Sequence, residues 1–470
     1  MLLVAVEARS PGSTREPPIQ DLHPDRVFAG LSFSPNRPVV AAVSGGSDSM
    51  ALLVLLDAFF RDRARAGGIV AMTVDHGLRP ESAGEAARVA AFCASRGIPH
   101  HTLPWRGDKP STGVSAAARE ARHRLLADAA RSLAAPMVLT GHTANDQAET
   151  VAMRRERGAG RGLAGMAPAT LYDGTTWFVR PLLPYPRAAL RTMLAGAGLS
   201  WIDDPSNAQA AYERVRVRQA FAGPDEDRIV ATLLYQGGLA ATQRIEAGRR
   251  AAGLIGRHAS LAAPGLVRID ARLLSEEDDA AARLAFRLLL SAVGGREHLP
   301  DAVRARSLLE RLALAPGRGS LGGTVADRRK GAVHLHREIR AGWTGAALAI
   351  PGAVWDGRFR IAAEGFWENV MIESIGKTLA VARAREFETA GVPSALVRAA
   401  LSAEPIVQVR KAGRSLDRPG LGGVGDLLRR VPAPYARFLP SFDLAPAEAL
   451  RALLGADDFP ASPWDSHNAA

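Results

Sequence analysis

The chain has 470 residues, of which 47% are hydrophobic and 23% charged, and its formal net charge is +11. This length allows about three domains, and the positive charge favours a polyanionic partner, first of all nucleic acid. The single cysteine, Cys93, excludes a disulfide framework, a zinc cluster and a CxxC redox pair within one chain. It favours a reducing, cytoplasmic setting. No apolar run has the length of a membrane span, so we expect no membrane partner.

Short apolar runs alternate with helical stretches between residues 38 and 183. The runs that we predict to be strands are Val39–Val43, Ile69–Val74, Pro99–Leu103 and Met137–Thr140. Helical spacing predicts helices over Ser49–Ala66, Glu81–Arg96 and Ser115–Ala134. Strands that alternate with helices in this way predict an α/β fold with a doubly wound parallel sheet.

The composition changes twice after this α/β region. Prolines gather at residues 181–186, the stretch from about 212 to 348 is rich in Ala, Leu and Arg, and short β-like pieces follow from Pro351. We therefore predict an N-terminal tail at 1–33, a catalytic α/β domain at 34–215, a mainly helical domain at 216–350 and a small C-terminal α+β domain at 351–470.

The segment Ser44–Ser49 (SGGSDS) lies between the first predicted strand and the next helix. Its glycines let backbone N–H groups approach an anion, its serines add hydroxyl donors, and the helix N-terminus adds partial positive charge. Asp48 alone would repel phosphate, so we expect it to hold a Mg²⁺ ion that bridges to the phosphates. The alternative is a serine–glycine turn in which Asp48 caps the helix. GxxxxGK[ST] does not occur here, so the segment is not a Walker A loop.

This loop is similar to the PP-loop of N-type ATP pyrophosphatases, which cleave ATP between the α- and β-phosphates and adenylate a substrate. Further segments resemble, in the same order, those of the tRNA(Ile)-lysidine synthetase family. They are VDHGLRPESAGEA at 74–86, GVSAAAREARHRLL at 113–126, GHTANDQAETVAMRRERGAGRGLAGM at 141–166, RPLLPYPR, and DDPSNAQAAYERVRVR ending at Arg218. The resemblance is dense from about residue 38 to residue 218 and thin beyond it.

Several polar residues in these segments suit nucleotide chemistry without the resemblance. Asp146 and Glu149 stand at i, i+3 on a predicted helix, where two carboxylates on one side could hold Mg²⁺ or a substrate ammonium. His142, just past a strand, could donate to a phosphate or adenylate oxygen, or it could bond its own loop. Arg119 and Arg122 could clamp a phosphate or stabilise leaving pyrophosphate, or they could form a solvated helix face.

The sequence departs from the family pattern at two of these positions. The family has two adjacent aspartates where this chain has Asn145 and Asp146. A metal-binding role at position 145 is therefore in doubt. The second aspartate of the family pattern, Asp146, and the glutamate, Glu149, are both present in this chain. His123 stands where the family usually has a tyrosine, which is a milder change.

Two arginine-rich segments predict contacts with RNA. GxGxxG at 160–165 matches a dinucleotide fingerprint, but it follows a basic helical segment and not a strand, so we interpret it as an RNA-contacting loop. Arginines also alternate between residues 214 and 218, where an extended segment would place them on one side; a solvated charge run is the alternative. The arginines predicted to contact tRNA are Arg154, Arg155, Arg157, Arg161, Arg214, Arg216 and Arg218.

The resemblance implies the PP-loop fold and a ligase that joins free L-lysine to C2 of the wobble cytidine in the CAU-anticodon isoleucine tRNA. The reaction passes through an adenylated base and releases AMP and pyrophosphate, with ATP and Mg²⁺ as cofactors. Asp48 is the expected Mg²⁺ ligand, with Asp146 as a second candidate. The residues expected to act in catalysis are Asp48, Arg119, Arg122, Asp146 and Glu149. Those expected to bind ATP are Ser44, Gly45, Gly46, Ser47, Asp48, Ser49, Val74, Asp75 and His142.

The sequence leaves open three alternative functions and the oligomeric state. A tRNA thiolation enzyme of the same superfamily is the nearest alternative, but such enzymes commonly use cysteine pairs and this chain has only Cys93. An amidotransferase-type synthetase would need a second domain with a nucleophilic cysteine. A non-catalytic RNA-binding protein with a degenerate PP-loop is a third alternative, which Asn145 keeps open. Family members are often dimers, and the sequence leaves a homodimer open.

Overall fold

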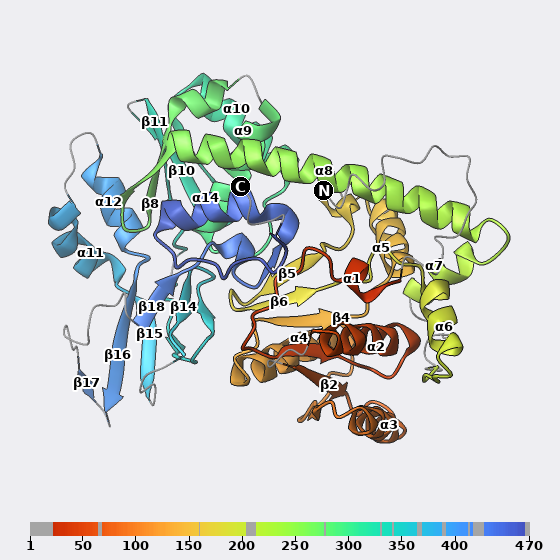
Figure 1. Cartoon of the computed structure of the whole chain (residues 1–470). Coiled ribbons are helices and arrows are strands. Elements are labelled where there is room, and N and C mark those ends of the chain that lie inside the picture. The colour runs from red at the N-terminus through yellow and green to blue at the C-terminus, as the bar shows by residue number, and fades with distance from the viewer. Residues whose placement is uncertain are drawn as a thin grey trace. The chain divides into compact units, whose positions relative to one another are not determined.

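The computed structural model describes residues 22–63, 68–158, 160–203, 213–276, 279–329, 331–340, 343–363, 369–387, 392–411, 414–416 and 427–465. The chain divides into two compact units (Figure 1). The first holds residues 1–244, 440–442 and 460–470, and the second holds 245–439 and 443–459. Of the predicted tail, residues 1–21 lie outside the described residues, and helix α1 (Pro24–Val27) follows them.

A mostly parallel sheet forms the core of the first unit. The six strands between residues 39 and 179 are β1 (Val39–Ala42), β2 (Ile69–Asp75), β3 (His100–Pro104), β4 (Met137–Thr140), β5 (Ala169–Tyr172) and β6 (Thr176–Val179). They lie in the order β5-β6-β4-β1-β2-β3, and all neighbours are parallel except the hairpin of β5 and β6. The predicted doubly wound sheet is confirmed, and each of the first four strands ends within one residue of its predicted bounds.

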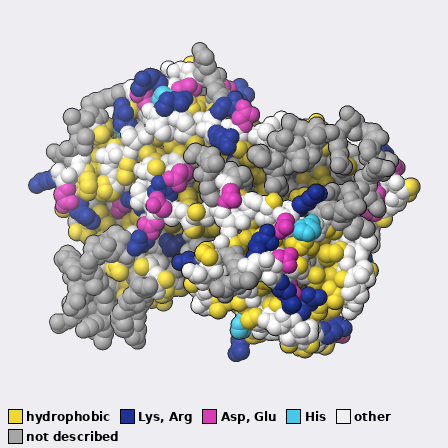
Figure 2. All heavy atoms as spheres, viewed as in Figure 1, with side chains coloured by type: hydrophobic (Ala, Val, Ile, Leu, Met, Phe, Trp, Pro, Cys, Tyr) yellow, Lys and Arg dark blue, Asp and Glu magenta, His cyan; other side chains and the backbone are white. Residues whose placement is uncertain are grey.

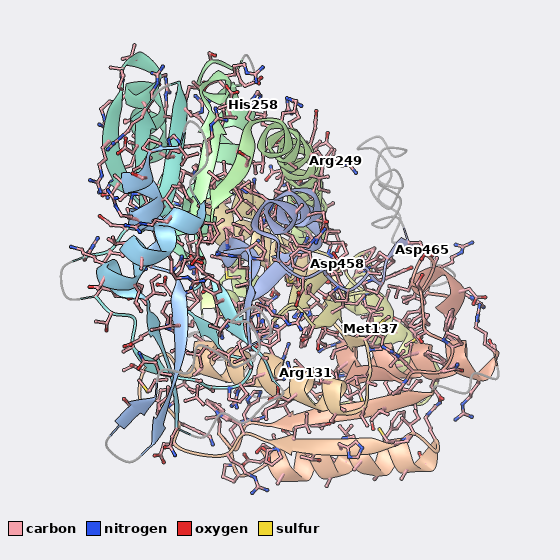
Figure 3. The ribbon with its side chains drawn as sticks, turned by 90° about the vertical axis from the view of Figure 1, so that its left-hand side faces the viewer. Arg131, Met137, Arg249, His258, Asp458 and Asp465 are labelled. Atoms are coloured by element: carbon pink, nitrogen blue, oxygen red, sulfur yellow. The ribbon has the colours of Figure 1, made fainter. Side chains whose placement is uncertain are left out.

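Helices alternate with the strands of this sheet and follow β6. They are α2 (Ser47–Arg61), α3 (Ser82–Ser95), α4 (Val114–Ser132), α5 (Ala144–Glu156), α6 (Arg187–Gly196) and α7 (Glu213–Phe221). α2 and α4 pack against the central strands, and α3 packs against β2 and β3. A short turn runs from Arg131 near the end of α4 to Met137 at the start of β4 (Figure 3). The following helix, α8 (Glu226–His258), continues past the boundary of the unit.

The second unit contains a five-stranded antiparallel sheet that the sequence did not predict. Its strands are β7 (Ala259–Ala263), β8 (Leu266–Asp270), β9 (Gly317–Leu321), β10 (Thr324–Arg329) and β11 (Ala332–Arg337), in the order β7-β8-β11-β10-β9. α9 (Asp279–Gly294) and α10 (Ala302–Leu314) accompany it. The expectation of a mainly helical segment at 216–350 was therefore incomplete.

The rest of the second unit has the expected α+β character. A four-stranded sheet holds β12 (Ala347–Leu348), β15 (Val370–Ser374), β16 (Pro405–Lys411) and β17 (Arg414–Leu416). A three-stranded sheet holds β13 (Val354–Trp355), β14 (Phe359–Ile361) and β18 (Leu428–Arg430). The remaining elements are α11 (Gly376–Ala384), α12 (Ser394–Leu401), β19 (Phe438–Pro440) and α14 (Leu444–Leu454).

One hydrophobic cluster of the second unit joins the two segments that we expected to be separate domains. Leu266 of β8 is fully buried and packs with Leu396 and Leu401 of α12. The compact units therefore do not coincide with the expected division at residues 215 and 350. Among the helices of the described segments, none is both long enough and apolar enough to cross a bilayer.

Candidate active site

The Ser44–Ser49 loop connects β1 to α2, as predicted, and its serines hold its shape. The Oγ of Ser49 accepts a hydrogen bond from the backbone N–H of Ser44 at 3.1 Å and donates to the carbonyl oxygen of Gly46 at 3.0 Å. Gly46 is the N-cap residue of α2 and supplies no side-chain cap to the helix. The helix thus begins without a side-chain partner for its first N–H groups, as expected where a bound anion takes that place.

At two positions at this end of the sheet, neighbouring atoms come so close to the backbone that only glycine fits. Gly45 has φ +88°, and a Cβ there would lie 2.5 Å from Cδ1 of Ile202. A Cβ on Gly141, directly after β4, would lie 2.7 Å from the backbone oxygen of Asp48. The end of β4 can therefore meet the first turn of α2 only because residue 141 has no side chain.

A cavity of about 480 Å³ opens at the carboxyl ends of β1, β2 and β4, a size typical of small-molecule sites and a place where doubly wound folds bind ligands. The predicted site residues that line it are Ser44, Gly46, Ser47, Asp48, Ser49, Val74, Arg122, His142, Asp146, Arg214 and Arg218. Lining residues that we did not predict include Met72, His76, Thr140, Arg187, Arg191, Ile202 and Asp203.

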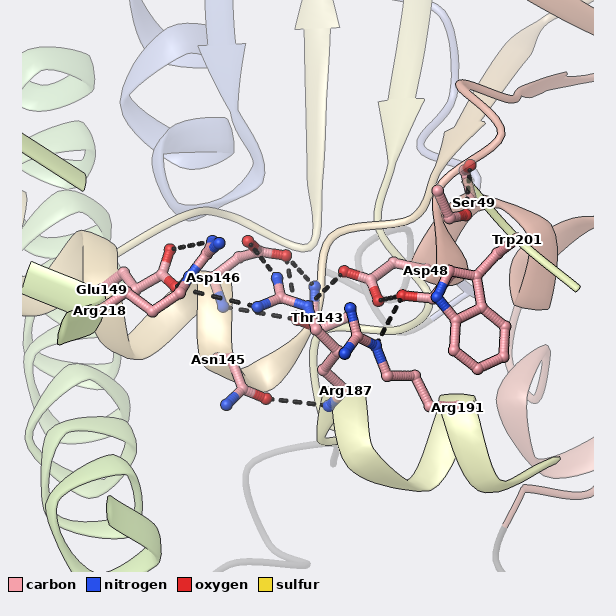
Figure 4. Close-up of polar contacts among 12 residues, drawn as sticks. Asp48, Ser49, Thr143, Asn145, Asp146, Glu149, Arg187, Arg191, Trp201 and Arg218 are labelled. Atoms are coloured by element: carbon pink, nitrogen blue, oxygen red, sulfur yellow. Dashed lines mark hydrogen bonds and ion pairs between the residues drawn. The ribbon is translucent and has the colours of Figure 1, made fainter. Parts of the chain in front are cut away.

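Arg187, the first residue of α6, bridges two carboxylates in this cavity (Figure 4). Its Nε donates to Oδ2 of Asp48 at 2.8 Å, and its Nη2 donates to Oδ1 of Asp146 at 3.0 Å. Burial by itself would lower the pKa of Arg187, but the charges of Asp146 and Asp48 raise it well above its usual value. The sequence offered little signal for this residue, since it ends RPLLPYPR in a chain with many arginines.

Both oxygens of the Asp146 carboxylate accept hydrogen bonds, Oδ1 from arginines and Oδ2 from Thr143. Its Oδ2 accepts from the backbone N–H of Thr143 at 2.8 Å and from the hydroxyl of Thr143 at 3.0 Å, which forms a capping box at the start of α5. Burial would raise the pKa of Asp146, but Arg214 and Arg187 outweigh it and hold the pKa at about 2. The side chain is therefore ionised at neutral pH.

Glu149 lies one turn further along α5, and its side chain is only 1% exposed. Nε of Arg214 donates to its Oε2 at 2.6 Å, and Nε of Arg218 donates to its Oε1 at 2.8 Å. The prediction that Asp146 and Glu149 share one helix is confirmed. Only Asp146 lines the cavity, whereas Glu149 lies behind the two arginines of α7.

The expected extended conformation of residues 214–218 is wrong, because these residues form α7. Helical spacing places Arg214 and Arg218 on one side, toward the cavity, and leaves Arg216 exposed. Arginines at every second position suggested an extended strand with one buried and one exposed face. Val215 and Val217 between them are indeed buried, but they are buried as residues of a helix.

Asn145 has a defined role in this structure. Its Oδ1 accepts a hydrogen bond from the backbone N–H of Arg187 at 2.9 Å (Figure 4). The bond satisfies an N–H at the start of α6, which has no side-chain cap from its N-cap residue, Pro186. An aspartate oxygen would accept the same bond, so the exchange of aspartate for asparagine keeps this contact.

His142, in the loop after β4, and Arg122 of α4 line the cavity. His142 Nδ1 lies 3.0 Å from the hydroxyl of Thr140. Burial, followed by the charges of Arg180 and Arg122, holds the pKa of His142 well below its usual value, so the imidazole is neutral. Burial also lowers the pKa of Arg122 to about 10, with a further contribution from Arg119. Both values reflect a site that is rich in positive charge and shielded from water.

Asp75 and Arg119 are predicted site residues that do not line the cavity. Asp75 ends β2, and its Oδ1 accepts from the backbone N–H of Gly77 at 2.8 Å, which shapes the turn toward His76. Arg119 shares α4 with Arg122, as predicted, but only Arg122 lines the cavity. Burial lowers the pKa of Arg119, with a contribution from Arg214.

The arginines at the C-terminal end of α5 differ from one another in their contacts. Nη1 of Arg154 donates to the carbonyl oxygens of Gly162 and Gly165 at 2.9 and 2.6 Å, so this side chain holds the 3₁₀ turn Gly160–Ala164 in place. Arg155 is exposed and lies 3.5 Å from Oε1 of Gln236. Arg157 is also exposed and pairs with Glu213. On the face seen in Figure 2, basic and acidic side chains are interspersed.

The cavity has the donor set that Mg²⁺ uses in nucleotide enzymes. Asp48 and Asp146 line it, and both bind one cationic group, the guanidinium of Arg187. Within the described segments no group of three or more His, Cys, Asp and Glu side chains could hold a metal by itself. Two carboxylates suit Mg²⁺, which commonly takes one or two protein carboxylates and completes its shell with phosphate and water.

Comparison with known proteins agrees with this geometry. A family model described as a PP-loop domain matches residues 22–223. The tRNA(Ile)-lysidine synthase of Mesorhizobium japonicum is 46% identical over 96% of this chain and 99% of the relative. The synthases of Rhizobium meliloti and Brucella canis are 40% and 37% identical, each over 92% of this chain and over 95% and 98% of the relative. The chain therefore belongs to the tRNA(Ile)-lysidine synthase family.

Proposed function

We propose that this chain joins free L-lysine to C2 of the wobble cytidine of the CAU-anticodon isoleucine tRNA and converts ATP to AMP and pyrophosphate. One observation carries the proposal. The Ser44–Ser49 loop, the carboxylates of Asp48 and Asp146 and several arginines line one cavity, in a chain whose relatives bear the name of this enzyme. The cytoplasm, which holds ATP, lysine and tRNA, is the proposed location.

In the first step the cytidine O2 attacks the α-phosphorus of ATP. An O–P bond forms, the bond from the α-phosphorus to the bridging oxygen breaks, and pyrophosphate leaves. The uncapped start of α2 and the guanidinium of Arg122 lie where they can stabilise charge on the phosphates. Arg191 also lines the cavity, and its Nε lies 3.3 Å from Oγ of Ser47 in the loop.

In the second step the ε-amine of lysine attacks C2 of the adenylated cytidine. A C–N bond forms, the C2–O bond breaks, and AMP leaves. Asp146 is ionised and faces the cavity, so it can attract the lysine ammonium. The ammonium must lose a proton to water before its nitrogen can form the C–N bond.

Asp48 is the residue that would hold Mg²⁺ next to the triphosphate, and Asp146 is the second candidate. Their shared guanidinium, from Arg187, marks the place between them as one that favours a positive charge. When bound, the ion would neutralise charge on the departing pyrophosphate.

The nearest alternative, a tRNA thiolation enzyme, has less support. Cys93 is the only cysteine of the chain, and its side chain is buried. Burial and the neighbouring charge of Asp57 raise the pKa of the Cys93 thiol to about 11. A thiol with this pKa and no access to solvent is a poor sulfur carrier.

The test is incorporation of radiolabelled lysine into a transcript of isoleucine tRNA with a CAU anticodon, in the presence of ATP and Mg²⁺. We expect label with the wild type and a loss of at least about a hundredfold with Asp48→Ala. The elongator methionine tRNA, which has the same anticodon, is the control and should take up no label. AMP formation without label would point to another nucleophile, and the absence of both would contradict the proposal.

A further inference from the structure

Glu149 is a buried carboxylate that the mechanism above does not use. Its side chain is 1% exposed, and both of its oxygens accept from guanidinium groups of α7. Oε2 binds Nε of Arg214 at 2.6 Å and Nη2 of Arg218 at 3.4 Å, while Oε1 binds Nε of Arg218 at 2.8 Å. Nη1 of Arg187 lies 4.0 Å from Oε1. Figure 4 shows Glu149 and Arg218 facing each other.

This arrangement does not suit a carboxylate that binds a substrate amine. An ammonium would have to displace Nε–H groups from oxygens that the cavity does not reach, because Glu149 is not among the lining residues. Asp146, by contrast, lines the cavity and is partly exposed, at 11% of its side chain. The sequence left open which of these two carboxylates positions lysine, and burial favours Asp146.

The arginines held by Glu149 do reach the cavity. Arg214 and Arg218 are one helical turn apart on α7, and both line it. Nη2 of Arg214 also donates to Oδ1 of Asp146 at 3.1 Å and to the Asp146 carbonyl oxygen at 3.2 Å. Each arginine thus turns its Nε toward Glu149, and a planar guanidinium fixed through one edge presents its other donors in a defined direction. Arginines in this state suit the oxygens of phosphate groups.

We propose that Glu149 is a positioning residue for Arg214 and Arg218, and that these two arginines bind the polyphosphate of ATP and the departing pyrophosphate. Glu149 then has no contact with lysine, and Arg214 and Arg218 act in the cavity instead of on the tRNA surface. The identity of the phosphate ligand rests on the function proposed above. The Arg214 and Arg218 side chains are 32% and 34% exposed, and the charge of Glu149 offsets the repulsion between their guanidinium groups.

The experiment compares Glu149→Gln with the wild-type full chain. Calorimetric titration measures affinity for pyrophosphate with Mg²⁺ and for α,β-methylene ATP, and lysine incorporation gives the KM for lysine. Glutamine keeps the shape but removes the charge that orients both arginines, so we expect affinity for pyrophosphate and the ATP analogue to fall by about tenfold or more. The KM for lysine should change by less than about threefold.

Asp57→Asn is the matched control. Asp57 is also a buried carboxylate between two arginines, with Arg61 Nε at 2.8 Å and Arg96 Nη1 at 2.9 Å, but it does not line the cavity. Its loss should lower stability and leave both affinities within about twofold of the wild type. A similar loss of pyrophosphate affinity in this control would overturn the proposal, because the effect would then be a general one of disrupted packing.

Three further outcomes are informative. A raised KM for lysine with unchanged pyrophosphate affinity would show that Glu149 binds the amine and would overturn the inference. If Glu149→Gln does not fold, Arg218→Gln replaces it, since the Arg218 side chain is 34% exposed and Glu149 keeps its bond to Arg214. Unchanged pyrophosphate affinity in Arg218→Gln would equally overturn the inference. A wild type that forms no lysidine would refute the proposed function, while the pyrophosphate titrations would still decide the role of Glu149.

Discussion

At the scale of single residues, the cavity depends on partners that are far apart in the chain. Asp48 comes from α2, Asp146 from α5 and Arg187 from α6, and one guanidinium binds both carboxylates. Asn145 fixes the backbone of Arg187, so a residue with no catalytic group of its own determines where that guanidinium lies.

Asn145→Asp should therefore leave lysine incorporation within about threefold of the wild type, because an aspartate oxygen can accept the same bond from the Arg187 N–H. Asn145→Ala removes the acceptor and should cost about 1 kcal/mol in the free energy of unfolding, together with a clear loss of activity as Arg187 shifts. Chemical denaturation and the labelled-lysine assay measure the two effects. Equal activity of the alanine and aspartate variants would contradict this role.

Some of these residues could be predicted from the sequence and others could not. Asp48 and Asp146 lie in segments that resemble family motifs in the same order along the chain, and Asp48 closely follows the two glycines of its loop. Arg187, Arg214 and Arg218 carry no comparable local signal, because arginine is common in this chain and their partners lie 41 to 139 residues away. Their function is set by packing of α6 and α7, which no short pattern encodes.

At the scale of elements, strand predictability follows from how each strand is buried. Parallel strands with both faces covered consist of continuous apolar runs, and β1 is such a run, with Val39, Val40 and Ala41 almost fully buried. β10 and β11 (TVADRR and AVHLHR) mix charged, histidine and apolar residues, so neither an apolar run nor a clean alternation marked them as strands. These two strands are stabilised by pairing with each other, with residue 324 opposite residue 337, and this pairing cannot be recognised from the local sequence pattern.

The packing of α4 on β6 makes stability sensitive to acid. His123 of α4 lies 4.9 Å, centroid to centroid, from Phe178 of β6, and its Nδ1 lies 2.8 Å from the carbonyl oxygen of Arg119. Burial lowers the pKa of His123 to about 4, against a weaker opposing effect of that hydrogen bond. The unfolded chain therefore takes up a proton near pH 6.5 that the folded chain refuses until about pH 4.

Stability from this source is complete above pH 6.5 and is lost as the pH falls toward 4. Lowering the pH from 7 to 5 should reduce the unfolding free energy of the wild type. The reduction should be about 2 kcal/mol smaller in His123→Phe, which keeps an aromatic ring against Phe178. Urea denaturation at the two pH values measures this difference. His101→Phe, at an exposed position of β3, is the control and should follow the wild type. If the wild type and His123→Phe lost the same unfolding free energy, His123 would be protonated as easily in the folded chain as in the unfolded chain.

At the scale of the whole molecule, a net charge of +11 should make binding of tRNA dependent on salt. The charge alone does not say which arginines contact phosphate, and neighbours in the sequence can differ. Arg155 is exposed, whereas Arg154 is partly buried and holds two carbonyl oxygens of the 3₁₀ turn that follows α5. The tRNA-binding role predicted for the arginines at the end of α5 remains a prediction.

Arg155→Ala should weaken tRNA binding and reduce the slope of log K against log salt by about 1, because a phosphate contact is lost. Arg154→Ala should mainly lower stability, by about 1–2 kcal/mol, because two carbonyl groups lose a charged donor. Filter binding at several salt concentrations and thermal unfolding separate the two. A salt slope that changes in Arg154→Ala but not in Arg155→Ala would reverse the assignment.

The burial of Cys93 has a practical consequence. Since a thiol with a pKa of about 11 is almost entirely protonated at neutral pH and is shut off from solvent, the natural chain should be nearly inert to maleimide dyes. A cysteine introduced at an exposed position such as Arg155 would then be the one site that reacts. Fluorescent labelling could follow the arrival and departure of RNA on this enzyme without first removing any native cysteine.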